Sequence, residues 1–399
     1  MNHSTENDKK NHARSARALP EGWIETTLGE VCDVKGGKRL PKGTNLISKK
    51  TNHPYIRITD LHNNQIIETN MEFVPEKIFP AISKYIVNSD DVIMSVVGTI
   101  GIVAKISSLL NGANLTENCV KLINLRNIDS NYLYFYLISR DGKHEIEKNT
   151  VGAVQKKLPI YGIQNIQLIL PPLLEQKAIA DVLSSFDNKI ELLREQNKTL
   201  EQTAQTVFNE WFGKYSVDEP ENLPEGWRVV KITEIIDRKA ISYKCTKSDL
   251  SETGSTPILD QGTDGLYGYT EREPDFIASP DKPVLVFTNH TCNYWFIDYP
   301  FSAIQNVIPY KGTNGYDEYF MYFLTKDSVT FTEYKGHWPE FEAKDFVIPP
   351  MERAQEFSKI TKPFLQKIQE NKKQIKLLSK TRDALLPRLM KGEMRVKKF

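Results

Sequence analysis

The sequence repeats itself, and this repeat constrains the fold more than any other feature. Leu19-Pro20-Glu21-Gly22-Trp23 returns as Leu223-Pro224-Glu225-Gly226-Trp227 in the second half of the 399-residue chain. A second pair of segments, Leu170-Pro171-Pro172-Leu173 and Ile348-Pro349-Pro350-Met351, follows in the same order. The chain therefore contains two copies of one unit, each with an opening motif, a variable body, a Pro-Pro hinge and a tail.

Both tails have apolar residues at alternating spacings of three and four, which is typical of a coiled coil. One such stripe can pack on any core, but two stripes in matching places favour helices that pack on each other. The expected contact positions are Ile190, Leu193, Asn197 and Leu200 in the first helix, and Ile368, Asn371, Ile375 and Leu378 in the second.

An antiparallel pairing of these helices brings Asn197 opposite Asn371. A buried Asn pair fixes the register at some cost in stability. The same register pairs Leu193 with Ile375, Leu200 with Ile368, and Trp211 with Phe357. Because proline breaks a helix interior, Pro363 and Pro387 limit the second helix to about 361–386, and we expect the first over about 185–212.

The bodies contain short β-type runs broken by Gly, Pro and Asn, and each has one aromatic, helix-like stretch, at 132–137 and 319–324. We therefore expect an α+β fold, in which two mixed α/β domains are joined by two long antiparallel coiled-coil helices with pseudo-two-fold symmetry. The expected segments are a disordered N-terminal extension (1–18), the first body (19–171), a central helix (172–217), the second body (218–349) and a C-terminal helix (350–399).

Composition is that of a globular protein, with 40% hydrophobic and 26% charged residues. No stretch approaches 18 consecutive apolar residues, and the opening residues lack the apolar core of a signal peptide. The four cysteines match no zinc or redox spacing. These features predict a cytoplasmic location with reduced thiols, no metal site and no membrane contact.

The net charge of +1 hides an uneven distribution. Residues 359–399 hold thirteen basic and three acidic residues, a net of +10, whereas residues 223–348 of the second body hold twelve basic and nineteen acidic residues. The basic helix permits three interpretations: a solvated face, contact with phosphates, or pairing with the acid-rich central helix and with acidic partner surfaces.

The double layout closely resembles the specificity subunit of type I restriction-modification systems. Individual runs also match, among them Tyr55-Ile56-Arg57-Ile58, Leu115-Thr116-Glu117-Asn118-Cys119, Gly152-Ala153-Val154-Gln155 and Gly336-His337-Trp338-Pro339-Glu340-Phe341. The resemblance implies that each body is a target recognition domain that reads one half of a split, asymmetric site in double-stranded DNA. It also implies that the helices form a spacer on which two adenine-N6 methyltransferase subunits dock, joined in some systems by restriction/translocase subunits. S-adenosylmethionine is then expected on the methyltransferases, and no cofactor on this chain.

Candidate DNA-binding residues lie in loops and turns of both bodies, where basic and amide side chains can reach phosphates and base edges. Each of them, taken alone, can instead be a solvated or structural loop residue without a role in DNA binding. In the first body they are Lys35, Lys38, Arg39, Lys42, Lys49, Lys50, Arg57, Thr116, Asn118, Gln155 and Lys156. In the second, acidic body they are Gln261, Thr263, Tyr267, Tyr269, Asn289, His290, Gln305, Asn306, His337 and Trp338.

Motifs for catalysis are missing from the sequence. The Pro-Pro hinges lack the flanking Asp or Asn and the aromatic residue that an adenine methyltransferase needs to hold a flipped base. No phosphate-binding loop of the Gly-x-x-x-x-Gly-Lys-Ser/Thr type is present. A non-catalytic recognition subunit is therefore favoured over two alternatives, a self-contained methyltransferase or nuclease and a coiled-coil scaffold without a DNA role.

Overall fold

The computed structural model describes residues 19–262 and 265–396. Their contacts divide the chain into two units: unit 1 contains residues 1–190 and 377–399, and unit 2 contains residues 191–376. Both long helices pass from one unit to the other, so that each unit consists of one body and parts of both helices. The expected extension over residues 1–18 lies outside the described residues.

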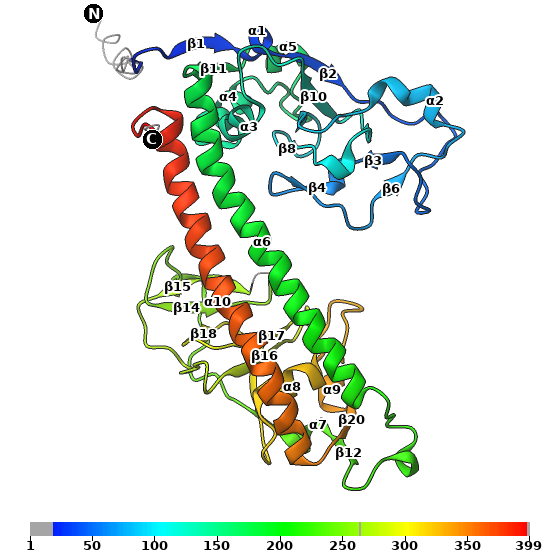
Figure 1. Cartoon of the computed structure of the whole chain (residues 1–399). Coiled ribbons are helices and arrows are strands. Elements are labelled where there is room, and N and C mark those ends of the chain that lie inside the picture. The colour runs from blue at the N-terminus through cyan, green and yellow to red at the C-terminus, as the bar shows by residue number, and fades with distance from the viewer. Residues whose placement is uncertain (1–18, 263–264, 397–399) are drawn as a thin grey trace, which may run out of the picture. The chain divides into compact units, whose positions relative to one another are not determined.

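Unit 1 contains three sheets and a hairpin (Figure 1). The first sheet pairs β1 (Ile24–Thr27) with β11 (Gln167–Leu170), and the hairpin joins β4 (Leu61–His62) to β5 (Gln65–Ile66). A four-stranded sheet has the order β2 (Asp33–Gly36), β10 (Cys119–Ile123), β7 (Val92–Ser95) and β8 (Val103–Lys105). A three-stranded sheet has the order β6 (Glu72–Phe73), β3 (Pro54–Ile56) and β9 (Asn114–Leu115). The helices of this body are α1 (Leu28–Val31), α2 (Phe79–Ile82), α3 (Ser130–Ile138), α4 (Arg140–Lys148) and α5 (Ile160–Gln164).

Unit 2 repeats this topology. Its two-stranded sheet pairs β12 (Arg228–Lys231) with β20 (Asp345–Ile348). The four-stranded sheet has the order β13 (Ile236–Arg238), β19 (Val307–Gly312), β16 (Val284–Thr288) and β17 (Tyr294–Ile297). The three-stranded sheet has the order β15 (Leu266–Thr270), β14 (Thr256–Leu259) and β18 (Ser302–Ala303). Its short helices are α7 (Ile232–Ile235), α8 (Glu318–Thr325) and α9 (Trp338–Glu342).

The two bodies share details that sequence comparison alone does not reveal. In each three-stranded sheet the last strand runs parallel to the middle one, β9 to β3 and β18 to β14. The aromatic helices α3 and α8 both begin after an aspartate, Asp129 or Asp317, whose side chain accepts hydrogen bonds from two backbone amides of the first turn. The expected α+β fold with two mixed domains is therefore confirmed.

The repeated opening motif forms the same turn in both units. Trp23 N donates to Pro20 O, and Trp227 N donates to Pro224 O, both at 3.0 Å. Gly22 and Gly226 have φ angles of 80° and 81°, which suit glycine at the third position of such a turn. A Cβ on either glycine would also contact the second proline of the following hinge. The opening motif and the Pro-Pro hinge thus pack against each other in each unit, which explains why they repeat together.

The long helices α6 (Leu173–Phe212) and α10 (Met351–Met390) run antiparallel (Figure 1). In unit 2, Asn371 Nδ2 donates to Asn197 Oδ1 at 2.8 Å and to Gln196 Oε1 at 2.9 Å, which confirms the expected Asn pair. The rings of Trp211 and Phe357 are 6.2 Å apart, as the same register requires. In unit 1, Asp187 of α6 forms an ion pair with Arg382 of α10.

The expected contact positions are largely buried. Ile190, Leu193, Ile368 and Asn371 are buried, while the other four, Asn197, Leu200, Ile375 and Leu378, are half-buried. The pairing of Leu193 with Ile375 and of Leu200 with Ile368 stays a prediction.

Helix α6 ends at Phe212 as expected, but the expected start of α6 and both expected ends of α10 were wrong. Helix α6 begins at Leu173, directly after the hinge, and α10 runs from Met351 through both prolines to Met390. Proline in a helix interior costs about 3 kcal/mol or more. The residues around Pro363 repay this cost, because Phe357, Thr361 and Leu365 are all buried in the core of unit 2.

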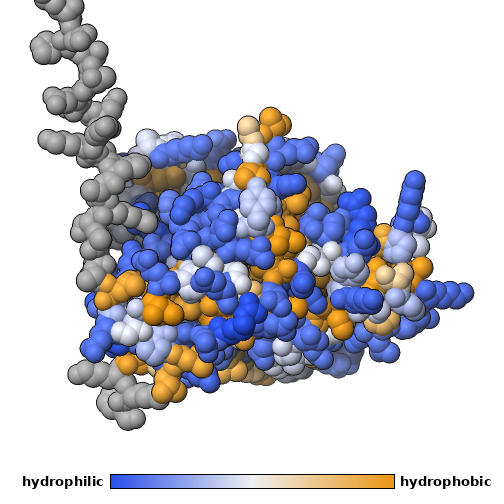
Figure 2. Space-filling model, turned by 90° about the horizontal axis from the view of Figure 1, so that it is seen from above, coloured by the Kyte–Doolittle hydropathy of each residue, from blue (hydrophilic) through white to orange (hydrophobic). Residues whose placement is uncertain are grey.

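None of the helices in the described segments is long and apolar enough to cross a membrane. On the face shown in Figure 2, hydrophobic side chains lie in small groups between hydrophilic ones. The four cysteines are all buried and form no disulfide.

Candidate nucleic-acid interface

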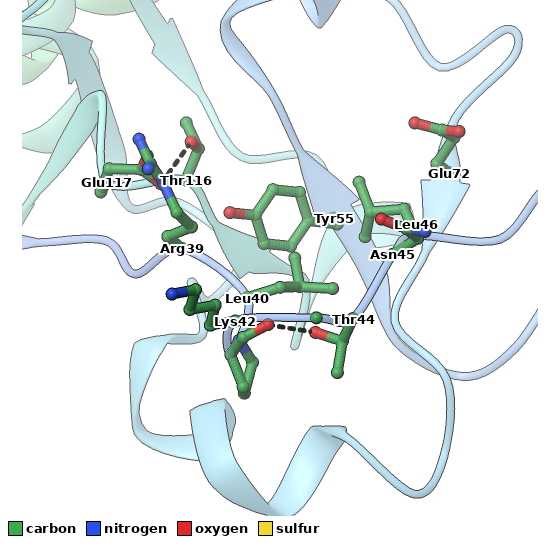
Figure 3. A pocket seen from close by; sticks show the side chains of 12 residues that line it. Arg39, Leu40, Lys42, Thr44, Asn45, Leu46, Tyr55, Glu72, Thr116 and Glu117 are labelled. Carbon is green, nitrogen blue, oxygen red and sulfur yellow. Dashed lines mark hydrogen bonds and ion pairs between the residues drawn. The ribbon is translucent and has the colours of Figure 1, made fainter.

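A pocket of about 630 Å³ in unit 1 brings three predicted residues together (Figure 3). Arg39 and Lys42 come from the long loop after β2, and Thr116 comes from the turn between β9 and β10. Tyr55 of β3 also lines the pocket, and its hydroxyl donates to Lys38 O at 2.9 Å. Burial raises the pKa of Tyr55, so this hydroxyl stays protonated and fixes the start of the basic loop.

Arg39 is held by a residue that the sequence interpretation did not select. Its Nε donates to Glu117 Oε1 at 2.6 Å, although 79% of the arginine side chain is exposed. Thr116 Oγ1 donates to the second oxygen, Oε2, at 3.2 Å. Burial opposes ionisation of Glu117, but its own backbone amide and Arg39 outweigh burial and lower its pKa. The pocket therefore presents a fixed carboxylate beside an exposed guanidinium.

The other basic candidates of the early loops differ in their availability. Lys35, Lys38, Lys49 and Lys50 are exposed, as surface contacts with phosphate require. Arg57, by contrast, forms ion pairs with the buried carboxylate of Asp60 and with Glu72. These pairs give Arg57 a role in holding β3 and β6 together, and a DNA contact would compete with it.

A second group of candidates lies in the exposed loop between α4 and α5. Gln155 and Lys156 are exposed there, next to Val154, whose side chain is 96% exposed. Lys156 lines a smaller pocket of about 420 Å³ with Lys143 and Thr150. Asn118, in the turn after Glu117, is half-buried, and its carbonyl accepts from Val96 N.

Unit 2 has a pocket of about 660 Å³ that contains four predicted residues. Asn289, Gln305, Asn306 and Trp338 line it. Arg238, Lys239 and Lys244 also line it, from the end of β13 and the loop after it, as the basic loop of unit 1 follows β2. A basic pocket thus lies in a body whose net charge is negative.

The side chains of His337 and Trp338, which the sequence interpretation selected as DNA-binding, are buried in the described structure. His337 is fully buried between Glu340, whose Oε2 is 2.9 Å from Nδ1, and the carbonyl of Glu333. Trp338 belongs to the core of unit 2, where Arg238 lies over its ring at 5.2 Å. Asn289 accepts from the backbone amides of both residues. The side chains of His337 and Trp338 therefore support the pocket wall from within.

The remaining candidates of unit 2 form a neighbouring group. Gln261 Oε1 accepts from His290 N at 2.8 Å, and the His290 ring stacks on Tyr334, which is 82% exposed. Tyr267 and Tyr269 alternate along β15 and are half-buried. Thr263 lies outside the described residues.

The basic part of α10 has partners within unit 2. Lys373 Nζ is 3.3 Å from Asp298, whose side chain is buried, and Lys376 lies over the ring of Tyr269. Lys372 is exposed on the same helix. Lys373 and Lys376 thus pack on the body of unit 2, an arrangement that the three sequence interpretations did not include.

Sequence interpretation missed Glu117, Arg238, Lys239 and Lys244. The signal was present in the repeat itself, since the segments after β2 and β13 correspond. Within the described ranges, no group of His, Cys, Asp and Glu side chains is arranged to hold a metal ion.

Comparison with known proteins agrees with this architecture. The family model of the type I restriction modification DNA specificity domain matches residues 20–202. The type I restriction enzyme MjaIX specificity subunit of Methanocaldococcus jannaschii is 25% identical, over 96% of this chain and 95% of that protein. The putative type I restriction enzyme MjaX specificity subunit of the same organism is 24% identical, over 95% of both proteins.

A solved structure shows the same fold. The crystal structure of the S subunit of a type I restriction-modification system from M. genitalium matches with a TM-score of 0.60 and 18% identity. The match covers 94% of this chain and 97% of that one, so it includes the second repeat, which the family model does not reach. Over nearly its whole length the chain is therefore similar to specificity subunits of type I restriction-modification systems.

Proposed function

We propose that the chain binds a bipartite, asymmetric DNA site, with each body reading one half-site. The observation that carries the proposal is that one topology occurs twice with different side chains in the corresponding pockets. The pocket of unit 1 is lined by Arg39, Lys42, Thr116 and Glu117. The pocket of unit 2 is lined instead by Gln305, Asn306 and Arg238. Two different readers on two similar frameworks suit two different half-sites.

The charge distribution supports a division of labour in this binding. Phosphate contacts fix a protein on DNA, and base contacts select the sequence. Unit 1 offers exposed lysines for the first task, whereas the body of unit 2 is acidic outside its pocket. We propose that partner subunits supply part of the phosphate contacts around unit 2, so that the chain grips DNA weakly alone and firmly in the complex.

We propose two adenine-N6 methyltransferase subunits as those partners, joined by restriction subunits in a complete system. The support is the resemblance to specificity subunits, together with helices α6 and α10, which are shared by both units and expose charged side chains along their length. S-adenosylmethionine is proposed for the methyltransferases alone.

The two helices are also proposed to set the gap between the half-sites. Inserting seven residues into each helix, after Gln196 in α6 and after Asn371 in α10, preserves the 3.5-residue seam period. The insertion adds about 10.5 Å of helix, or about three base pairs of DNA.

Methylation sequencing of cells that express this variant with its methyltransferase tests the proposal. The expected motif keeps both half-sites and has a longer gap between them. Altered half-sites with an unchanged gap would contradict the role of the helices. Methyl transfer by the purified chain without partner would instead favour a self-contained methyltransferase, and a failure to bind specific DNA with the partner present would favour a scaffold.

A further inference from the structure

The turns that precede β10 and β19 are equivalent positions of the two repeats. Each leads from the strand that lies parallel in the three-stranded sheet into the second strand of the four-stranded sheet. Glu117 stands two residues before Cys119, the first residue of β10, and Gln305 stands two residues before Val307, the first residue of β19. The two residues therefore occupy equivalent structural positions in the two repeats.

Both side chains line the pocket of their own unit, which basic residues also line. Arg39 and Thr116 hold the Glu117 carboxylate in place. Gln305 is exposed, and its side chain makes no hydrogen bond within residues 19–262 and 265–396. In the same described part of unit 2, Arg238 and Lys244 form no ion pair. The side chain of the turn residue is thus held by hydrogen bonds in unit 1, whereas in the described part of unit 2 it has no hydrogen-bond partner.

These two side chains differ in what they accept from a base. A carboxylate only accepts hydrogen bonds, and its two oxygens have room for about four, of which the side chains of Arg39 and Thr116 use two. In the major groove it suits the amino groups of cytosine and adenine and disfavours guanine and thymine, which present acceptors. A glutamine amide donates and accepts, which matches the paired edge of adenine.

We propose that Glu117 and Gln305 each contact one base and set the preference at one position of their own half-site. The proposal rests on the proposed function, because it names the readers within the two recognition units. In unit 1 the base is one with a major-groove amino group, and Arg39 lies beside it to contact a neighbouring guanine or phosphate. The simplest alternative is that the Arg39–Glu117 ion pair and the exposed amide of Gln305 only stabilise the loops in which they lie.

Reciprocal exchange, Glu117→Gln and Gln305→Glu, separates these two roles. Each variant is expressed with the methyltransferase partner, and genomic methylation is sequenced. We expect Glu117→Gln to change the base preference at one position of one half-site by roughly ten- to a hundredfold. Gln305→Glu is expected to do the same at one position of the other half-site.

Matched controls make the same chemical change elsewhere. Glu25→Gln, at an exposed position of β1, and Gln202→Glu, at an exposed position of α6, should leave the motif unchanged. If Glu117→Gln proves unstable, Gln305→Glu decides alone, because Gln305 makes no side-chain hydrogen bond among the described residues whose loss would destabilise the fold.

The outcomes also separate this proposal from the one beneath it. A wild-type complex without sequence-specific methylation would refute the proposed function. A bipartite wild-type motif that both exchanges leave unchanged, or that either exchange alters in both half-sites, would overturn only the assignment of Glu117 and Gln305.

Discussion

Units 1 and 2 share their sheets, their opening turn and their hinge, but they differ in how their pockets treat charge. In unit 1, the exposed Arg39 is tied to Glu117 within the pocket. In unit 2, the corresponding turn carries the neutral Gln305. Arg238 and Lys244 line the same pocket and have no ion-pair partner in the described ranges. The buried framework is therefore conserved between the repeats while the turn residues vary, which allows a recognition surface to change without a change of fold.

The shared opening turn approaches its hinge more closely in unit 2 than in unit 1. An alanine Cβ at position 226 would come within 3.0 Å of Pro350, whereas at position 22 the distance to Pro172 is 3.4 Å. Both glycines have positive φ, which costs other residues about 1–2 kcal/mol. We expect Gly226→Ala to lower the free energy of unfolding by about 2–3 kcal/mol and Gly22→Ala by about 1–2 kcal/mol.

Denaturant unfolding measures both effects. Gly36→Ala is the control, because Gly36 has no positive φ and nothing within 4 Å of the added Cβ. Equal losses at positions 22 and 226 would show that the closer approach to the hinge in unit 2 has no energetic meaning.

The buried Asn371 in the helix pair depends on polar side chains of α6 for its hydrogen bonds. Its amide donates to Asn197 and Gln196, while its Oδ1 has no partner among the described residues. Asn197→Ala should cost about 1–2 kcal/mol, since it leaves the Asn371 amide with one acceptor fewer.

The double variant Asn197→Leu/Asn371→Leu should be at least as stable as the wild-type chain. Its helices should no longer keep one fixed register. Denaturant unfolding measures the first effect, and crosslinking of cysteine pairs in the two helices measures the second. A double variant less stable than the single one would contradict a stability cost of the buried Asn pair, and unchanged crosslinking would contradict a role in register.

The pockets should respond differently to loss of their arginine. Arg238 has no carboxylate partner in the described part of unit 2, whereas Glu117 already neutralises part of the charge of Arg39. We expect Arg238→Gln to weaken DNA binding by the complex by about 1 kcal/mol, and Arg39→Gln by less.

Titration at several salt concentrations tests this difference. If both arginines contact phosphate, each variant reduces the salt slope by about one. A larger loss for Arg39→Gln would mean that its pair with Glu117 breaks on binding and that the arginine itself reads a base.

The smallest expected effect concerns an acid of unit 2. Glu201 of α6 is partly buried, which opposes ionisation, but Lys326 and the hydroxyl of Tyr322 outweigh burial and lower its pKa. Because the pKa is lowered in the folded state, this contribution is present above the unfolded value near 4.5 and is lost as the pH falls below it.

Glu201→Gln should therefore cost about 0.5 kcal/mol at pH 7 and nothing near pH 3. Thermal unfolding across this range measures the difference. Glu195→Gln, at an exposed position of the same helix, is the control and should leave the stability at pH 7 unchanged. A cost for Glu201→Gln that persists at pH 3 would place its origin in packing.

The sequence predicted the features that are periodic or repeated. The double layout, the two long helices and the Asn197–Asn371 register followed from spacing, because a buried seam imposes a 3.5-residue period on its residues. The ends of α10 did not follow, because the burial of Phe357 and Leu365 outweighs the local effect of Pro363. Sheet order depends on pairings between distant segments and leaves no local pattern.

Site residues were predictable only where their chemistry and position agree. Arg39, Lys42 and Thr116 do meet in one pocket, since the loop after β2 and the turn before β10 lie side by side. His337 and Trp338 have suitable polar groups, yet the fold buries them, and exposure cannot be read from residue type. Glu117 was missed because an acid is not expected in a DNA-binding surface.

Methylation sequencing of cells that carry the wild-type chain with its methyltransferase partner tests the central claim most directly. Two recognition units of one topology and different surfaces predict a methylated motif with two unlike specified parts and a fixed, unspecified gap between them. A single uninterrupted motif, or a motif that is the same without this chain, would contradict it.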